Sequence, residues 1–164
     1  MATRTITVSA NLPVAPERAY AVLADYLDGH RRILPPQFTE MTVEQGGIGA
    51  GTIIRFQMTA FGRKQNFRAA ITEPEPGRVL VETGLDAKRV VTTSIVDPGH
   101  HANECHVTFT TELPVRGGLI GVIEGFMAER YLRPIYLEEL QRLGQVAATY
   151  TPANHPLKTN ARFA

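Results

Sequence analysis

Between residues 37 and 113, hydrophobic and polar side chains alternate with a period of two, which is typical of β-strands with one buried face. Clusters of glycine, proline and aspartate interrupt the alternation at short intervals. The pattern predicts six strands in this part of the chain, at Phe38–Gln45, Thr52–Phe61, Arg63–Glu73, Arg78–Thr83, Ala87–Asp97 and Glu104–Leu113.

A seventh strand is predicted at the start of the chain, over Thr3–Ala10, where Ile6 and Val8 alternate with threonine and serine. The links between the six later strands are short and contain turn-forming pairs such as Phe61-Gly62 and Pro98-Gly99. Short links of this kind join neighbouring strands as antiparallel hairpins. We therefore expect one antiparallel sheet of seven strands.

The alternation also assigns the strand residues to two faces. One face carries polar side chains such as Arg55, Arg68 and Thr92. The other face is expected to hold Ile54, Phe56, Met58, Phe67, Ala69, Ile71, Val79, Val81, Val91, Ile95, Cys105, Val107 and Phe109. An antiparallel sheet with one apolar face needs a cover on that face, which only helical segments can supply here.

Two short helical segments follow the first strand. A helix is predicted over Ala15–Leu27, with Pro16 in its first turn and Gly29 as its C-cap. A further helical turn is predicted at His30–Leu34, before a pair of prolines. The longest helical pattern lies near the end of the chain, over Gly118–Tyr150.

Pro134 interrupts this long helical pattern near its middle. Proline removes a backbone hydrogen bond and clashes with the preceding turn, so we expect a kink near Pro134. The apolar stripe of the helix also changes direction there. We expect the two halves to differ in role, with residues 118–133 covering one part of the sheet and residues 135–148 packing on the sheet and the first helix.

These elements together predict an α+β fold in which a seven-stranded curved antiparallel sheet grips a long C-terminal helix, kinked near Pro134, with a short helical pair after the first strand. The length of 164 residues suits a single domain with its own core, which we place at residues 1–150. Residues 151–164 are polar, contain two prolines and lack periodicity, so a disordered tail is expected there.

Composition narrows the classes of function. Seventeen basic and 16 acidic residues are interspersed and give a net charge of +1, which argues against nucleic-acid binding. A single cysteine, Cys105, excludes an internal disulfide framework and suits a reducing compartment. The N-terminal residues do not resemble a signal peptide, and no apolar run reaches the length of a membrane span. We therefore expect a cytoplasmic protein.

Several short motifs occur in an order that resembles one known family. They are Val14–Asp25 (VAPERAYAVLAD), Ile33–Pro35, Gly49–Thr52 and the hairpin Thr72–Arg78. Together with the order of elements, over roughly residues 3–148, they resemble the START-like or SRPBCC superfamily of the helix-grip fold. The resemblance implies a cavity between the long helix and the concave sheet, which in members typically holds an apolar or aromatic small molecule.

If the resemblance holds, apolar and aromatic residues of the sheet and the first half of the long helix should line that cavity. The expected lining residues are Phe56, Met58, Phe67, Val81, Val91, Phe109, Ile123, Phe126, Met127 and Tyr131. Arg89 and Arg130 are the possible polar anchors for a ligand. The same aromatic and methionine set is equally compatible with a solid core.

No catalytic group or cofactor is predicted. The expected inward positions from Ile54 to Phe109 include no Asp, Glu or His, which argues against acid–base catalysis from the sheet unless a bulge shifts the alternation. His100, His101, Cys105 and His106 do not form a predicted metal site, because strand neighbours such as Cys105 and His106 point to opposite faces.

Three functions remain open. The first is binding of a hydrophobic or aromatic small molecule, such as a lipid or polyketide-like compound. The second is a polyketide cyclase- or aromatase-like enzyme in which Arg89, Arg130 or Tyr131 holds an enolate. The third is a homodimeric interaction module, since Gly117, Gly121 and Gly125 repeat every four residues and predict a slim helix face. The absence of inward acids and bases favours binding.

Overall fold

The computed structural model describes residues 2–152, and its strands follow the hydrophobic alternation of the sequence. The chain forms, in order, β1 (Ala2–Leu12), α1 (Pro16–Ala24), α2 (Gly29–Ile33), β2 (Phe38–Gln45), β3 (Ile53–Ala60), β4 (Arg63–Glu75), β5 (Val79–Gly84), β6 (Val91–Pro98), β7 (Cys105–Val115) and α3 (Gly118–Thr149). Every strand predicted from the sequence is present, with ends displaced by a few residues.

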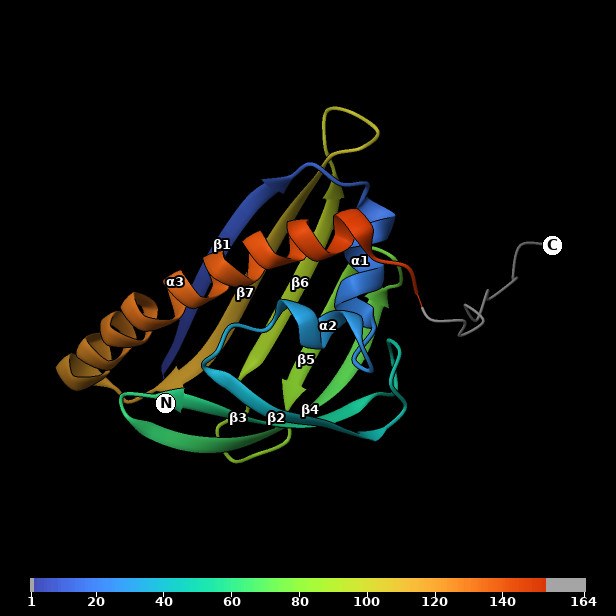
Figure 1. The fold of residues 1–164 in the computed structure, drawn as a ribbon. Helices are drawn as coiled ribbons and strands as arrows, with labels where there is room; N and C mark the ends of the chain where they lie inside the picture. The colour runs from blue at the N-terminus through green and yellow to red at the C-terminus, as the bar shows by residue number, and fades with distance from the viewer. Residues whose placement is uncertain (1, 153–164) are drawn as a thin grey trace.

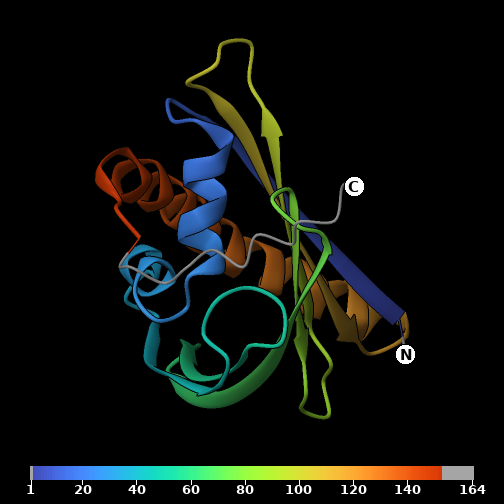
Figure 2. The ribbon, with the colours of Figure 1, turned by 90° about the vertical axis from the view of Figure 1, so that its right-hand side faces the viewer.

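The seven strands form one sheet in the order β1-β7-β6-β5-β4-β3-β2, and every neighbouring pair is antiparallel. Six of the strands are joined as successive hairpins, and β1 closes against β7. Figure 1 and Figure 2 show α1, α2 and α3 on the same face of this sheet. The predicted α+β architecture, with helices covering one apolar face, is confirmed.

The strands β2, β3 and β4 curl toward the helices, which makes the helix-facing side of the sheet concave (Figure 2). Register shifts interrupt β2 and the pairing of β4 with β5, the latter between Thr72 and Glu75. Glu40, within β2, has a positive φ of 52°. Bulges of this kind bend a strand and increase its twist, so they contribute to the curvature.

The C-terminal half of α3 packs on α1 and the sheet, as the sequence predicts. Leu140 and Leu143 of α3 and Val22 of α1 are inaccessible to solvent. They belong to one hydrophobic cluster with residues of β1, β6 and β7. Burial of each such side chain contributes about 1.5–3 kcal/mol, so this cluster fixes the helix against the sheet.

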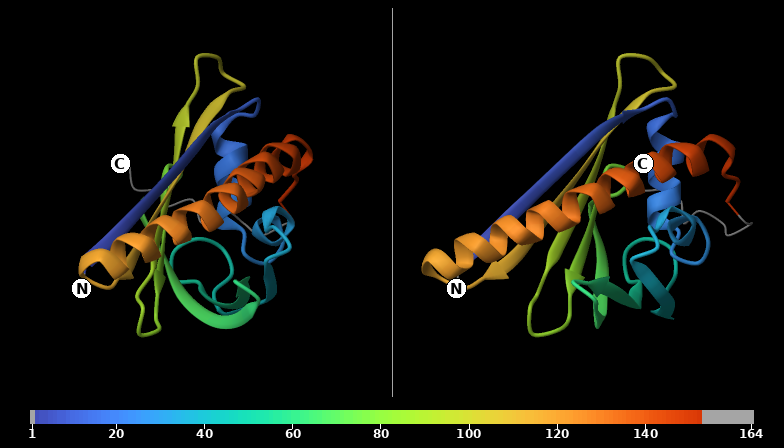
Figure 3. Two further views of the ribbon diagram at one scale, coloured as in Figure 1. Left: turned by 90° about the vertical axis from the view of Figure 1, so that its left-hand side faces the viewer. Right: turned by 60° about the vertical axis from the view of Figure 1, so that its left-hand side comes forward.

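The N-terminal half of α3 runs alongside β1 (Figure 3). Gly121 and Gly125 are the buried residues of this half, and a Cβ on Gly125 would lie 3.1 Å from the Arg4 side chain of β1. Arg4 also forms an ion pair with Glu129 of α3. The helix continues through Pro134 without a break, while the kink near that residue stays a prediction.

The connection between α1 and α2 differs from the sequence prediction. The helix α1 ends at Ala24, and Gly29 begins α2 instead of capping α1. Asp25 lies between them, and its carboxylate accepts hydrogen bonds from the backbone N–H groups of Leu27 and Asp28 at 3.0 and 3.1 Å. Tyr150 also donates a hydrogen bond to this carboxylate, which ties the end of α3 to the turn.

Two further predictions concern the whole chain. None of the helices in residues 2–152 is both long enough and apolar enough to span a membrane. The predicted disordered tail, residues 151–164, lies mostly outside the described residues.

Candidate functional site

A cavity with a volume of about 650 Å³ lies between the concave face of the sheet and the middle of α3. Strands β2 to β7, the end of α2 and one side of α3 supply its wall. Most of the wall is apolar. The cavity lies on the concave side of the sheet, where α3 packs against β1 and β7 while the curled strands β2–β4 stand off from the helix.

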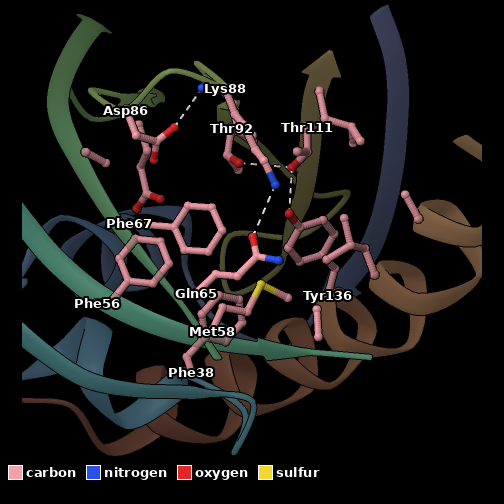
Figure 4. A pocket seen from close by; sticks show the side chains of 18 of the residues that line it. Phe38, Phe56, Met58, Gln65, Phe67, Asp86, Lys88, Thr92, Thr111 and Tyr136 are labelled. Carbon is pink, nitrogen blue, oxygen red and sulfur yellow. Dashed lines mark hydrogen bonds between the residues drawn. The ribbon is translucent and has the colours of Figure 1, made fainter. Parts of the chain in front are cut away.

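Aromatic rings form one side of the wall. Phe56 and Phe67 stack with their ring centroids 5.4 Å apart, and Phe38 packs at an angle on Phe56 at 5.8 Å (Figure 4). Phe109 lies on β7, and its ring is nearly perpendicular to the Tyr136 ring, with 6.2 Å between the two centroids. Such a surface offers flat apolar faces to a planar or aliphatic ligand.

A chain of hydroxyl groups crosses the opposite side (Figure 4). The hydroxyl of Thr111 donates a hydrogen bond to the Tyr136 hydroxyl at 2.8 Å, and the hydroxyls of Thr92 and Thr111 lie 3.0 Å apart. Burial raises the pKa of Tyr136 to about 12, despite the lowering effect of the hydrogen bond from Thr111. Tyr136 is therefore a neutral hydroxyl at physiological pH.

The buried end of the cavity is acidic. Glu82 of β5 and Glu139 of α3 both belong to the wall. The hydroxyl of Tyr26 donates a hydrogen bond to Glu82 at 2.5 Å, and the Nε2 atom of His30 lies 3.7 Å from the same carboxylate oxygen. Burial, and then the charge of Glu82, raise the pKa of Glu139 to about 8.

The mouth of the cavity lies between α3, the β3–β4 hairpin and the β5–β6 connection. The Tyr131 hydroxyl donates a hydrogen bond to the carbonyl oxygen of Thr59 at 2.6 Å. The Nζ atom of Lys88 donates to the side-chain oxygen of Gln65 at 3.2 Å (Figure 4). These two contacts connect the elements on either side of the opening.

Six of the ten residues expected to line a cavity lie in this wall. They are Phe56, Met58, Phe67, Phe109, Met127 and Tyr131. Three different strands and α3 contribute them, so the structure brings them together from distant parts of the chain.

Val81 and Val91 were expected in the wall, but the structure places both on the opposite face of the sheet. Val81 pairs with Thr72, and Val91 pairs with Glu112, both of which are exposed. Paired residues of antiparallel strands project to the same face. The inward residues of β5 and β6 are therefore Leu80, Glu82, Thr92 and Ser94, and the predicted face of these two strands was wrong.

Ile123 and Phe126 were also expected to cover the cavity, yet they are 52 % and 61 % exposed. The face of α3 that meets the sheet carries Gly121 and Gly125 instead. The apolar stripe of Leu119, Val122, Ile123 and Phe126 points to solvent. Because Gly121 and Gly125 are buried within the chain, the glycine face is not available to a second subunit.

The two cations named as ligand anchors do not belong to the wall of the cavity. Arg89 lies in the connection between β5 and β6, is exposed and has a positive φ of 46°. Arg130 is exposed on α3. Residues 87–90 are not part of β6, because the backbone N–H of Gly84 donates to the carbonyl of Val90 and closes a loop.

Three titratable residues at the buried end of the wall are not among the lining residues expected from the sequence: His30, Glu82 and Glu139. Glu82 was placed outward with the rest of the β5 face. A helical projection that includes polar residues finds Glu139, since it lies within one turn of the buried residues Tyr136 and Leu143. His30 is buried, and its Nδ1 atom lies 2.7 Å from the Leu23 carbonyl oxygen.

Comparisons with known proteins agree with this geometry. Residues 3–148 match the family described as "Polyketide cyclase / dehydrase and lipid transport". No curated protein sequence matches the chain.

Solved structures share the fold at low sequence identity. The KanY protein has a TM-score of 0.78 at 22% identity, over 90% of this chain and 99% of that one. The Zhui aromatase/cyclase from Streptomyces sp. R1128 has a TM-score of 0.72 at 15% identity, over 90% and 94%. A START superfamily protein from Mycobacterium smegmatis has a TM-score of 0.71 at 11% identity, over 87% and 99%.

Proposed function

The chain belongs to the polyketide cyclase/dehydrase and lipid-transport family, and on this basis we propose that it binds one apolar or aromatic small molecule in the cavity between α3 and the sheet. The membership confirms the START-like or SRPBCC resemblance noted in the sequence. A lipid or a polyketide-like compound is the ligand class that we infer.

The observation that carries the proposal is the cavity itself. Its volume of about 650 Å³ lies within the range of roughly 300–1,000 Å³ that is usual for small-molecule sites. The wall combines stacked aromatic rings, Phe56 and Phe67, with a few polar groups at one end. Apolar walls with a small number of polar groups are typical of binding sites that orient a ligand.

Apolar burial supplies the driving force. A two-ring ligand that loses about 250 Å² of apolar surface to water gains roughly 6 kcal/mol. Part of this gain is offset by the lost freedom of the ligand. Since 6 kcal/mol corresponds to a dissociation constant of roughly 40 μM, we expect constants of tens to hundreds of micromolar for small aromatic probes, and tighter binding for the natural ligand.

Fluorescence titration with N-phenyl-1-naphthylamine, whose diarylamine nitrogen is uncharged at neutral pH, tests the proposal. The protein should bind one molecule per chain with increased emission. Ala128→Phe places a ring in the cavity from α3 and should weaken binding about tenfold or more. Ala148→Phe on the exposed side of the same helix is the matched control and should leave the affinity unchanged.

Equal affinity in Ala128→Phe and the unchanged protein would place the probe outside the cavity and contradict the proposal. Thermal unfolding of both variants serves as the control for folding. If Ala148→Phe also loses binding, the weaker binding of Ala128→Phe comes from a damaged helix and not from a filled cavity.

A cyclase-like enzyme is the second candidate, and the observation that favours it is the presence of two inward carboxyl groups, Glu82 and Glu139. A pair of acids in different environments can donate and accept a proton during an enolisation. The test is turnover of a poly-β-ketone analogue. A catalytic carboxyl predicts a loss of roughly a hundredfold in Glu82→Gln with probe binding retained, and an absence of turnover in the unchanged protein removes the candidate.

A further inference from the structure

Glu139 is a buried carboxyl group without a partner. It projects from α3 into the wall of the cavity and is 7 % exposed. Across residues 2–152, no side chain or backbone group forms a hydrogen bond or an ion pair with it. Its oxygen atoms are not among the solvent-inaccessible side-chain atoms that lack a partner, so they open onto the cavity. Buried carboxyl groups are usually paired within the protein. A ligand in the cavity can therefore reach this carboxyl group and supply the missing partner.

The neighbours of Glu139 already have partners of their own. Glu82 of β5 accepts a hydrogen bond from Tyr26 and faces His30 of α2. The Nδ1 atom of His30 lies 2.7 Å from the Leu23 carbonyl oxygen, which can only accept, so Nδ1 carries the hydrogen. Tyr136 of α3 accepts a hydrogen bond from Thr111. In this group, Glu139 is the residue for which the described part of the chain supplies no hydrogen-bond or ion-pair partner.

The electrostatic surroundings of Glu139 are negative. The titratable groups around it are Glu82, Tyr26, Tyr136 and His30. Burial and the charge of Glu82 hold the pKa of Glu139 at about 8, so the isolated carboxyl is mostly protonated at neutral pH. A positive charge placed between Glu139 and Glu82 would instead favour the ionised form of Glu139, since an opposite charge stabilises a carboxylate.

The cationic side chains of the wall are engaged at the mouth. Arg68 pairs with Glu44, and Arg116 pairs with Glu124. Lys88 forms a hydrogen bond with Gln65. The buried end therefore combines two carboxyl groups with a single histidine, and the nearby phenylalanine rings offer faces that attract cations.

We propose that the buried end of the cavity binds the protonated amino group of an aromatic or otherwise apolar amine through Glu139 and Glu82. This inference rests on the proposed binding of an apolar or aromatic molecule in the cavity and narrows that molecule to one that carries an amino group. The apolar body of the ligand lies against Phe56 and Phe67, and its ammonium group donates hydrogen bonds to the two carboxylates. Glu139 loses its proton to the solvent in the binding step, so charge and protons balance.

Three probes with the same skeleton test the proposal: 4-phenylbutylamine, 4-phenylbutanol and 4-phenylbutyrate. Isothermal titration calorimetry at pH 6.5, in buffers of different ionisation enthalpy, measures both the affinity and the protons exchanged. The amine should bind roughly tenfold or more tightly than the alcohol, because hydrogen bonds to charged groups are the stronger ones. Close to one proton should be released for each amine bound.

The affinity for the amine should rise with pH below the pKa of Glu139. Release of one proton on binding means a gain of about tenfold per pH unit between pH 6 and 7. Glu139→Gln should remove both the proton release and the preference for the amine. Glu138→Gln is the matched control, since Glu138 lies on the outer side of the same helix and pairs with Arg142.

Four results would overturn the proposal. The first is an alcohol that binds as tightly as the amine, and the second is an amine that binds without proton release. The third is an affinity that falls as pH rises, which would mean that protonated Glu139 donates to a neutral oxygen. The fourth is a failure of all three probes while N-phenyl-1-naphthylamine still binds. That last pattern would reject the amine and leave the proposed function intact, whereas loss of the naphthylamine as well would reject both.

Discussion

The hydroxyl of Tyr131 donates a hydrogen bond to the backbone carbonyl of Thr59 across 2.6 Å, which joins α3 to β3 at the mouth of the cavity. The Phe61 ring packs on the Tyr131 ring with 4.9 Å between their centroids. Both contacts connect the helix with the β3–β4 hairpin. The opening on this side is therefore narrowed by one hydrogen bond and one pair of rings.

Removal of this hydrogen bond should make ligand exchange faster. A typical net hydrogen bond contributes about 1 kcal/mol, so Tyr131→Phe should raise the dissociation rate of N-phenyl-1-naphthylamine roughly fivefold. Stopped-flow displacement measures the rate. Tyr150→Phe is the matched control, because it breaks the bond to Asp25 at the other end of α3 and should leave the rate unchanged. Equal rates in Tyr131→Phe and the unchanged protein would contradict a role for this contact.

Glu139 should make the folded protein less stable at alkaline pH. Its pKa of about 8 in the folded chain exceeds the ordinary value of 4.5, so the folded state holds the proton more tightly than the unfolded state does. The stabilisation is complete below pH 4.5 and is lost as pH rises through about 8.

Urea unfolding at pH 5.5 and pH 9 measures this effect. Between these values the free energy of unfolding of the unchanged protein should fall, on the order of a few kcal/mol, relative to that of Glu139→Gln. In the control variant Glu138→Gln, the free energy of unfolding should fall between pH 5.5 and pH 9 as it does in the unchanged protein. A Glu139→Gln variant with the same pH dependence as the unchanged protein would show that Glu139 titrates normally.

The sequence of β5 does not show which of its two faces points into the cavity, and for this reason Glu82 was not predicted as a wall residue. Val79, Leu80 and Val81 are consecutive apolar residues, so alternation alone does not say which of them points inward. The pairing with β4 decides it, and β4 contains a register shift between Thr72 and Glu75. The strand itself was predictable from the sequence, whereas the inward position of Glu82 depends on this bulge.

Leu80 and Val81 should respond differently to substitution. Leu80 is inaccessible to solvent, so Leu80→Ala should lower the free energy of unfolding by about 2–5 kcal/mol. Val81 lies on the outer face, and Val81→Thr should change stability by less than about 0.5 kcal/mol and leave probe affinity unchanged. Chemical denaturation and probe titration measure both. Weakened probe binding in Val81→Thr would mean that Val81 does line the cavity.

Gly121 should tolerate no side chain, in contrast to Gly117. A Cβ on Gly121 would lie 1.6 Å from the carbonyl oxygen of Arg116, so the start of α3 would have to move. Gly121→Ala should therefore cost about 1–3 kcal/mol of stability. Gly117 has a φ of −73° and open space around it, so Gly117→Ala should be nearly neutral. Equal stability of the two variants would contradict the close approach of the Arg116 carbonyl group to Gly121.

For the long helix, too, the element was predictable from the sequence, whereas the orientation of its first half was not. Its length and the burial of Leu140 and Leu143 follow from periodicity. The orientation of its first half does not, because Leu119, Val122 and Phe126 form the stronger apolar stripe and yet face solvent. Glycine lets the backbone of α3 approach β1 closely. The glycine side of the helix therefore faces β1, and the apolar stripe faces solvent.

A bound small molecule should lie inside the cavity and not on the exposed apolar stripe of α3. Intermolecular nuclear Overhauser effects between bound N-phenyl-1-naphthylamine and assigned methyl groups distinguish the two locations. Contacts to Met58 of β3, Ala69 of β4 and Ala128 of α3 are expected, because all three belong to the wall of the cavity. Contacts confined to Leu119 and Val122, or no contacts at all, would contradict binding inside the cavity.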